Sequence, residues 1–384
     1  MAIDLEYFGD KLKKLRTQLE ITISEVALNT GLSSDRMSQF ENGSLEPSGD
    51  DILILADYFK RDYNYFISGE RFTDFEKIDT LYRKYGNEFS KEDRWAIQEF
   101  IYLCENEHFV LESLETKFLK FNYEKKTDFE KQQGIDAAKD LRNFLGYSDF
   151  NKIPVDIYSD FRKLGFHIFR RKLGNSNISG LCLLHKDAGK CILINYDEDI
   201  YRQRFSVTHE AGHAILDEDL GNEISISLKN EKRSYSEIRA NNFASKFLIP
   251  EGLLEHFVSH KFDWNENNLV EYSKKLKVNF QTLIYSLKNS GVIEEWKEKE
   301  LLKIKPKFIL KYDEEITSDL PPRIRNAKLL LLEKGLSTYY VRKCFDAYSQ
   351  GIISRGKFAE ILLTNEKELP EILSLFNLRL MHEH

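Results

Sequence analysis

Long hydrophobic runs are missing from this sequence of 384 residues. No stretch approaches the roughly 18 uninterrupted apolar residues that a membrane-spanning helix needs. The N-terminus, MAIDLEYFGDKLKKL, is charged from Asp4 onward and lacks the basic start and apolar run of a signal peptide. These two absences argue against a membrane or secreted protein, and they predict a cytoplasmic location with no membrane partner.

Cysteine and proline are also scarce, with 4 and 7 residues. The cysteines show no CxxC spacing, and scattered cysteines in a cytoplasmic protein are mostly reduced and structural. This excludes a disulfide framework. Low-complexity tracts and internal repeats are absent, so domain boundaries must come from changes of pattern. The length predicts more than one domain.

Four segments follow from those changes. Residues 1–70 carry short helical patterns, and residues 71–130 have the charged, striped pattern of a helical connector. Residues 131–295 mix strand and helix patterns, and residues 296–384 are helical again. The predicted fold class is therefore multidomain, with an α+β domain between all-α regions.

The N-terminal segment contains two short helices joined by a turn. In TISEVALNTG, Thr22 and Glu25 have capping-box spacing, and Gly31 ends the helix. The next helix, in SSDRMSQFENG, turns Met37 and Phe40 inward. This geometry lays the second helix in the major groove of DNA.

The same segment resembles the lambda-repressor-like, or XRE, helix-turn-helix family. The resemblance rests on Ala27, Gly31, the Glu41-Asn42-Gly43 turn, Pro47 and Leu55-Ala56. It implies DNA contacts from the outward side of the second helix, at Ser34, Asp35, Arg36, Ser38 and Gln39.

Charge argues against simple DNA binding. Residues 1–70 hold 13 acidic and 7 basic side chains, which is −6 of the chain's net charge of −7. Neutralisation of phosphates by Lys and Arg supplies most nonspecific DNA affinity. Ile23 also replaces the glutamine with which the family usually contacts a phosphate. Two partners stay open for residues 1–70: operator DNA, or a protein contact such as a homodimer or substrate mimicry.

The α+β segment contains three predicted strands and two long helices. The predicted strands are FHIFRR, ISGLCLLHK and KCILINY, and the last two form a hairpin around the DAG turn. The first predicted helix is YRQRFSVTHEAGHAILDE, and a loop follows it. The second predicted helix is SEIRANNFASKFLIP, which ends at Pro250. An exposed edge of ISGLCLL would accept an extended peptide by strand addition.

The first of these helices carries an HExxH motif. His209 and His213 lie at i and i+4, on one helix face, so both rings can reach one metal ion. Glu210 projects about 100° round the helix, where it can act as a general base without ligating the metal. A catalytic zinc needs a third ligand, and Glu237 on the second helix is the best candidate. Asn241, one turn on, is predicted to hold a liganding histidine.

Weaker candidates surround this set. Asp217 and Glu218 rank below Glu237 as ligands, because Asp217 lies a further turn beyond His213. A donor for the developing oxyanion is also required, and the sequence does not choose among Tyr235, Arg202 and Arg239.

Residues 131–290 resemble the ImmA/IrrE family of bacterial metallopeptidases, through FRKLGFHIFRR, ISGLCLL, ILINYD, RQRFSVTHEAGHAILDE and SEIRANNFASKFLIP in that order. The resemblance implies a zincin-like fold with a small sheet, similar to a reduced thermolysin. It also implies one zinc per chain, with Mn as an in vitro substitute, held by His209, His213 and Glu237, and Glu210 as base. The expected partner is an XRE-type repressor that serves as substrate.

The leading hypothesis is a zinc-dependent endopeptidase that cleaves an XRE-type repressor or related regulatory protein and relieves repression in a stress or mobile-element response. The alternative is a DNA-binding transcriptional regulator or antitoxin, whose peptidase-like domain senses a signal or binds a partner. In a third hypothesis, the first domain is an internal substrate or inhibitor of the peptidase.

Overall fold

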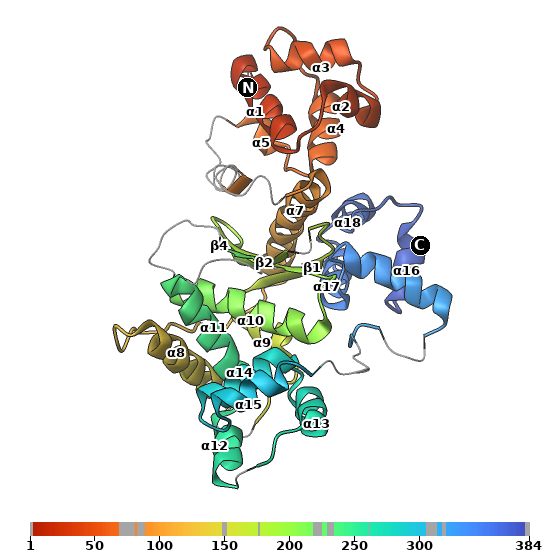
Figure 1. The fold of residues 1–384 in the computed structure, drawn as a ribbon. Coiled ribbons are helices and arrows are strands. Elements are labelled where there is room, and N and C mark those ends of the chain that lie inside the picture. The colour runs from red at the N-terminus through yellow and green to blue at the C-terminus, as the bar shows by residue number, and fades with distance from the viewer. Residues whose placement is uncertain are drawn as a thin grey trace.

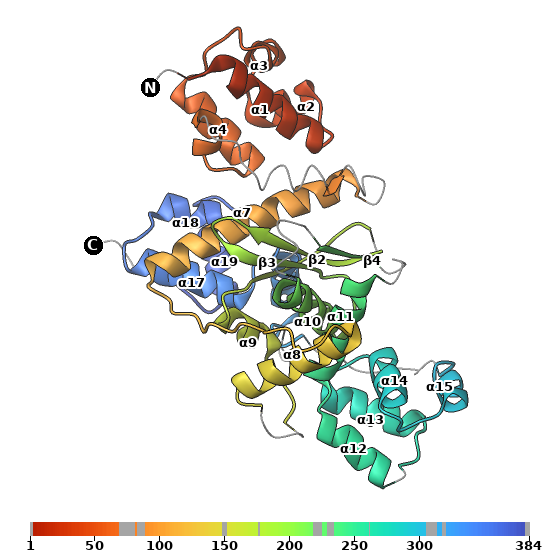
Figure 2. The same cartoon turned by 90° about the vertical axis from the view of Figure 1, so that its left-hand side faces the viewer.

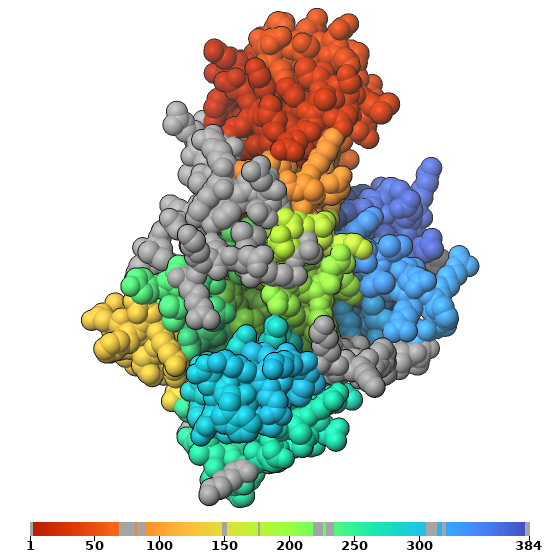
Figure 3. Space-filling view, in the orientation of Figure 1, coloured from red at the N-terminus to blue at the C-terminus, as the bar shows by residue number. Residues whose placement is uncertain are grey.

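The computed structural model of the chain describes residues 3–68, 81–82, 89–147, 152–175, 177–217, 225–228, 234–260, 262–304, 313–316 and 320–380. A small sheet lies near the centre, helices surround it, and an N-terminal lobe projects at the top (Figure 1, Figure 3). No helix within these ranges is long and apolar enough to cross a membrane.

The N-terminal lobe is all-helical, as predicted. It consists of α1 (Leu5–Gln18), α2 (Ile23–Thr30), α3 (Ser34–Glu41), α4 (Gly49–Phe59) and α5 (Asn64–Ile67). The capping box at the start of α2 is confirmed, because Thr22 and Glu25 bind each other's backbone N–H groups. Gly31 ends α2 in the left-handed conformation, at φ 74°. Met37 and Phe40 are buried in the lobe's own core, also as predicted.

The helix α7 (Lys91–Ser113) joins this lobe to the rest of the molecule. On one side, Arg94 donates to the backbone carbonyl of Gln18, and Gln98 donates to that of Phe59. On the other side, Ile97, Phe100, Leu103 and Cys104 enter a core that includes one face of the sheet. Figure 2 shows α7 lying between the N-terminal lobe and the sheet.

The predicted helical connector is wrong beyond α7. The chain runs without helix from Leu114 to Phe129, although the apolar stripe of FVLESLETKFLKF favoured a helix there. Glu115 adopts a left-handed conformation, with φ 52°, which ends the helix. The backbone N–H of Leu119 then donates to the carbonyl of Lys163, so tertiary contacts replace helical hydrogen bonds.

The sheet has four strands in the order β1-β3-β2-β4. They are β1 (His167–Arg171), β2 (Ile178–His185), β3 (Gly189–Asn195) and β4 (Ser225–Leu228). The β2–β3 hairpin is confirmed, and β1 pairs with β3 in parallel. The strand β4 falls in the predicted loop and pairs antiparallel with β2. The expectation of a free edge on ISGLCLL is therefore wrong, because β4 covers it and is the outer strand of the sheet within the described residues.

Each face of the sheet belongs to a different hydrophobic core. The face towards α7 also packs on the C-terminal helices α16 (Pro322–Glu333), α17 (Thr338–Ser349), α18 (Arg355–Ile361) and α19 (Leu369–Leu375). The predicted all-α C-terminal region is confirmed, and it shares this core with the sheet. The opposite face packs on the helices that carry the HExxH and Glu237 segments (Figure 2).

This second core contains the remaining helices. They are α8 (Glu130–Phe144), α9 (Ile157–Lys163), α10 (Ile200–Leu216), α11 (Tyr235–Leu248), α12 (Glu251–Ser259), α13 (Glu266–Leu276), α14 (Phe280–Asn289) and α15 (Glu295–Leu301).

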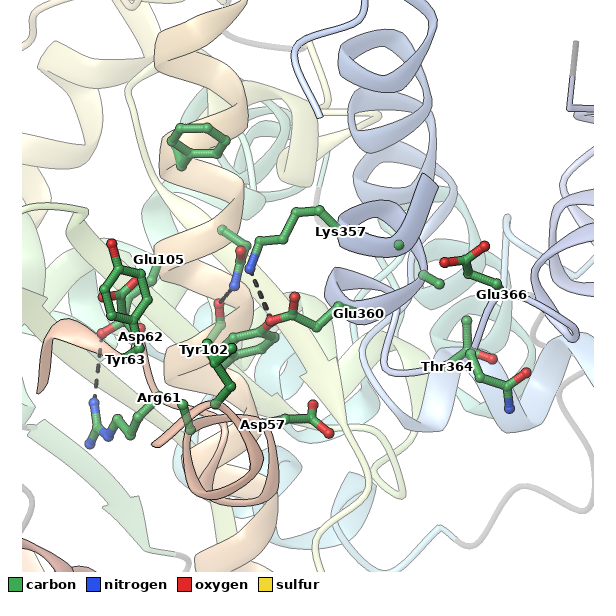
Figure 4. A pocket seen from close by; sticks show the side chains of 17 residues that line it. Asp57, Arg61, Asp62, Tyr63, Tyr102, Glu105, Lys357, Glu360, Thr364 and Glu366 are labelled. Atoms are coloured by element: carbon green, nitrogen blue, oxygen red, sulfur yellow. Dashed lines mark hydrogen bonds and ion pairs between the residues drawn. The ribbon is translucent and has the colours of Figure 1, made fainter. Parts of the chain in front are cut away.

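A groove of about 760 Å³ opens where the N-terminal lobe, α7 and α18 meet (Figure 4). Tyr102 on α7 donates its hydroxyl to Glu360 on α18, at 2.5 Å, and Lys357 donates to the same carboxylate. Polar contacts thus tie the C-terminal helices to α7 beside its junction with the N-terminal lobe.

The helices α8 and α11 pack at a glycine. A Cβ atom at Gly134 would lie 2.2 Å from the carbonyl oxygen of Arg239 and 3.0 Å from the amide nitrogen of Phe243. Both contacts are with backbone, which cannot rotate away. Gly134 therefore sets how closely α8 supports the helix that carries Glu237.

We predict that Gly134→Ala lowers the free energy of unfolding by about 1–3 kcal/mol, the usual cost of overpacking. Thermal unfolding measures this. Gly49→Ala is the matched control, because Gly49 begins a helix and a Cβ there meets nothing within 4 Å. Equal melting temperatures for the two variants would contradict the prediction.

Candidate metal centre

The helix α10 presents the HExxH motif to the interior. Asp199 caps it by accepting hydrogen bonds from the backbone N–H groups of Tyr201 and Arg202. His209 and Glu210 are buried with exposures of 4% and 0%, and His213 has an exposure of 6%. Polar groups buried this deeply require partners, so the environment of each side chain is informative.

The helix α11 supplies the third predicted ligand. Ser234 caps the helix by accepting a hydrogen bond from the backbone N–H of Glu237, which places that residue in the first turn. On the side towards α10, Gly212 leaves room for α11, since a Cβ there would lie 3.0 Å from the ring of Phe243 and 3.3 Å from the Cα of Ala240. The two helices approach closely, and Glu237 reaches the histidines.

The structure brings all three predicted ligands together. The Nε2 atoms of His209 and His213 are 3.1 Å apart. Glu237 places Oε1 3.1 Å from the Nε2 of His213 and Oε2 3.4 Å from that of His209. Within the described ranges, these residues form the one group of three or more His, Cys, Asp or Glu side chains close enough to share a metal ion.

The donor atoms fit a tetrahedral ion of zinc's size. Zinc bonds of 2.0–2.2 Å at tetrahedral angles separate two ligand atoms by about 3.3 Å. The observed separations of 3.1–3.4 Å are close to this value, with a different oxygen of Glu237 beside each histidine, and the three ligand atoms lie within 4.8 Å of one another. Two imidazoles and one carboxylate also leave a fourth coordination position, as catalytic zinc sites do.

Asp217 and Arg239 form a second layer around His213. Asp217 binds the Nδ1 of His213 at 2.8 Å, and Arg239 binds the other oxygen of Asp217. Burial lowers the pKa of His213, but the hydrogen bonds with Asp217 and Glu237 outweigh it and raise that pKa to about 10. A metal must therefore displace a proton from this imidazole, so binding and proton release are coupled.

The structure does not bring Asn241 to the histidines. Its side chain is exposed and donates to the backbone carbonyl of Glu237, at 2.8 Å. Asp217 is in the position to fix the tautomer instead. It caps the C-terminus of α10, one turn beyond His213 on the same helix, and its carboxylate reaches the Nδ1 of that histidine. The spacing of four residues from His213 to Asp217 was the available signal, although it indicates a hydrogen-bond partner and not a ligand. Glu218 lies outside the described residues.

Glu210 lies on the side of α10 that faces the sheet. Burial raises the pKa of its carboxyl group, although the nearby histidines and a hydrogen bond lower it. Its Oε1 accepts a hydrogen bond from the hydroxyl of Ser227 on β4. Its Oε2 is buried and has no hydrogen-bond partner within the described part of the chain. One oxygen is thus held while the other is available to a reactant.

The three candidate oxyanion donors differ in their surroundings. Arg202 is bound to Glu198, at 2.8 Å, and Arg239 is bound to Asp217. Tyr235 begins α11, two residues before Glu237, and is 71% exposed. Both arginines are therefore engaged in ion pairs, whereas the side chain of Tyr235 is exposed. The four cysteines are buried and unpaired, as predicted.

The DNA-contact residues predicted from the N-terminal segment lie on α3. Ser34, Asp35 and Gln39 are exposed, and Ser38 is half-buried. Arg36 is also half-buried, and its guanidinium group binds Asp51 at 2.6 Å. The helix α3 lies at the end of the molecule farthest from the sheet (Figure 1).

Comparisons with known proteins agree with both halves of this description. Residues 161–288 match the IrrE N-terminal-like domain, and residues 8–62 match a helix-turn-helix domain. The chain joins a helix-turn-helix domain to an IrrE-like domain. The IrrE-like match contains all four strands of the described sheet and all three residues of the candidate metal-binding triad.

One relative is the radiation response metalloprotease IrrE of Deinococcus radiodurans, which is 33% identical over 99 residues. The alignment covers 25% of this chain and 30% of that protein. The similarity thus spans less than a third of the relative's length, and it supports a metallopeptidase domain without extending to the whole protein.

We predict that Asp217→Asn weakens metal binding by the IrrE-like domain about 10- to 100-fold, because the loss of a carboxylate behind a liganding histidine has this typical cost. Competition with a chromophoric chelator measures the affinity. Asn241→Ala is the control and should leave the affinity unchanged. The opposite ranking would show that Asn241 supports the histidine after all.

Proposed function

We propose that the chain is a zinc-dependent endopeptidase whose centre is formed by His209, His213, Glu237 and Glu210. The observation that carries this proposal is the spacing of the three ligand atoms, beside a buried carboxylate with one oxygen unengaged. Two imidazoles and one carboxylate are a ligand set of hydrolytic zinc enzymes, and we expect one zinc per chain, with Mn as an in vitro substitute.

Zinc bound by this triad would supply Lewis acidity, which polarises a carbonyl and lowers the pKa of water towards neutrality. Glu210 would take the proton from the attacking water and give it to the leaving amine. Its burial raises the pKa of the carboxyl group, which helps it to carry a proton between the two steps.

The substrate we propose is a regulatory protein of the XRE repressor type. The helix-turn-helix domain supports this, since it ties the peptidase to transcriptional regulation. The name of the Deinococcus radiodurans relative, radiation response metalloprotease, connects a related metalloprotease with a radiation response. An extended substrate segment would pair with the outer edge of β4, next to Glu210.

We predict that Glu210→Gln keeps zinc but lowers cleavage about 10²- to 10⁴-fold, the usual contribution of a general base. The assay uses fluorescein-labelled casein and XRE-type repressors from the same genome, with product masses and zinc content measured in parallel. His213→Ala is the reference variant and should lose both zinc and activity. Undiminished proteolysis by the Glu210 variant would exclude this mechanism, whereas an inactive but operator-binding wild type would favour a regulator or antitoxin.

A second candidate function is recognition of operator DNA by the N-terminal domain. The exposed, distal position of α3 favours it. Most of the domain's basic side chains, however, already have partners: Lys11 binds the carbonyls of Tyr65 and Ser68, and ion pairs engage Arg16, Arg36, Lys60 and Arg61. We propose that base contacts from α3 outweigh phosphate contacts.

DNA binding by the full chain should therefore depend weakly on salt, with log K falling against log [salt] at a slope of about −2, for two or three phosphate contacts. Fluorescence anisotropy with the chain's own promoter measures this. Gln39→Ala should reduce affinity for that promoter and leave the slope unchanged. Absence of binding at low salt would leave the protein-contact hypothesis for this domain.

A further inference from the structure

The pairing of β2 with β4 has an irregularity beside α10. Ile178 pairs with Leu228, but Gly180, two residues further on, pairs with Ser227, only one residue back. Ser179 is the extra residue of this β-bulge, and its hydroxyl donates to Glu198 at 2.8 Å. In an uninterrupted antiparallel ladder, Ile226 would stand opposite Gly180. The bulge places Ser227 there.

The bulge decides which side chain of β4 faces Glu210. Residues directly opposite each other in an antiparallel pair share one face of the sheet. Ser227 therefore shares the face of Gly180, towards α10, while Ile226 pairs with Leu181 and enters the core under α7. The shift in register thus keeps an apolar side chain in the core and turns a hydroxyl towards the carboxylate.

Gly180 provides the space for this contact. A Cβ there would lie 3.4 Å from the Oε1 of Glu210 and 2.9 Å from the Cδ1 of Ile194. The missing side chain lets the carboxylate of Glu210 lie directly over the Gly180–Ser227 pair. Glu210 is fully buried, and Ser227 is its one hydrogen-bond donor among the described residues.

We propose that Ser227 is a positioning residue for Glu210. By donating to Oε1, its hydroxyl fixes the orientation of the carboxylate and leaves Oε2 directed at the reacting water. This inference rests on the proposed peptidase function for the role of Glu210. The terminal torsion of a glutamate is broad, so without a fixed donor the carboxylate would sample several orientations.

Hydrogen bonds to a charged group are strong, and their loss in a buried site is not compensated by solvent. Removing the hydroxyl should therefore affect the step in which Glu210 acts. It should not affect metal binding, since the Ser227 hydroxyl donates to Glu210 and not to any of the three ligands in the described structure. A purely structural serine would instead affect stability and metal content together.

The test compares Ser227→Ala and Ser227→Thr with wild type, using zinc-loaded full-length protein and fluorescein-labelled casein. Ser227→Ala should lower kcat about 10- to 100-fold with KM within about twofold, as expected for the loss of a charged hydrogen bond. Ser227→Thr, which keeps the hydroxyl, should remain within about threefold of wild type. Ser259→Ala, which removes an exposed hydroxyl on α12, is the control.

A second measurement does not need turnover. Acetohydroxamic acid chelates an active-site zinc and donates a hydrogen bond to the neighbouring carboxylate base, so its affinity reports the orientation of Glu210. Calorimetry should show weaker binding to Ser227→Ala, by about tenfold, and near wild-type binding to Ser227→Thr. Zinc content and melting temperature should match wild type in both variants.

The outcomes separate the two proposals. If wild type cleaves no protein but Ser227→Ala still weakens hydroxamate binding, the peptidase function fails and the positioning role stands. The positioning role is overturned if Ser227→Ala matches wild type in both measurements. It is also overturned if Ser227→Ala and Ser227→Thr both lose zinc or stability. A wild type that binds neither zinc nor hydroxamate overturns both.

Discussion

The close packing of α10 against α11 is the constraint on which the metal centre depends. Gly212 and Ala240 let the two helices approach until the ring of Phe243 lies against α10. At that distance, Glu237 in the first turn of α11 reaches both His209 and His213. Gly134 then fixes the other side of α11 against α8. A larger side chain at Gly212 would separate α11 from α10 and move the carboxylate away from the histidines, and one at Gly134 would displace α11 from α8.

The centre also shows how a fold accommodates ionisable groups in its interior. Burial disfavours the charged form of an ionisable side chain. Each buried carboxylate of this centre is stabilised by a partner of opposite charge or by a hydrogen-bond donor. Burial raises the pKa of Glu237, but hydrogen bonds from the two imidazoles lower it well below the usual value. Asp217 in turn balances His213, and Arg239 balances Asp217. Removal of one member of this cluster would therefore leave its neighbours without a partner.

The helix α7 gives the N-terminal domain a defined place relative to the sheet of the IrrE-like domain. Arg94 and Gln98 bind backbone carbonyls at the ends of α1 and α4, and both side chains are buried. The next turns of the same helix pack under the sheet. A segment whose sequence indicated only a connector therefore carries contacts in both directions. The polar contacts of Tyr102 with α18 extend the same support to the C-terminal helices (Figure 4).

The sequence by itself determined the local elements and the chemistry that each could offer. Capping residues and glycine defined α2, and the hairpin turn defined β2 and β3. The HExxH spacing put two imidazoles on one face of a helix. These features depend on residues within a few positions of each other, so the sequence alone suffices to predict them.

Tertiary structure alone decided how those elements meet. The short strand β4, with four residues, has too little pattern to be predicted, and pairing with β2 is what stabilises it. The same pairing brings Ser227 to Glu210, and the packing of α11 leaves Asn241 exposed, where it donates to the backbone carbonyl of Glu237 and not to a histidine. Side chains distant in sequence come together only when burial and register have fixed the helices and strands that carry them.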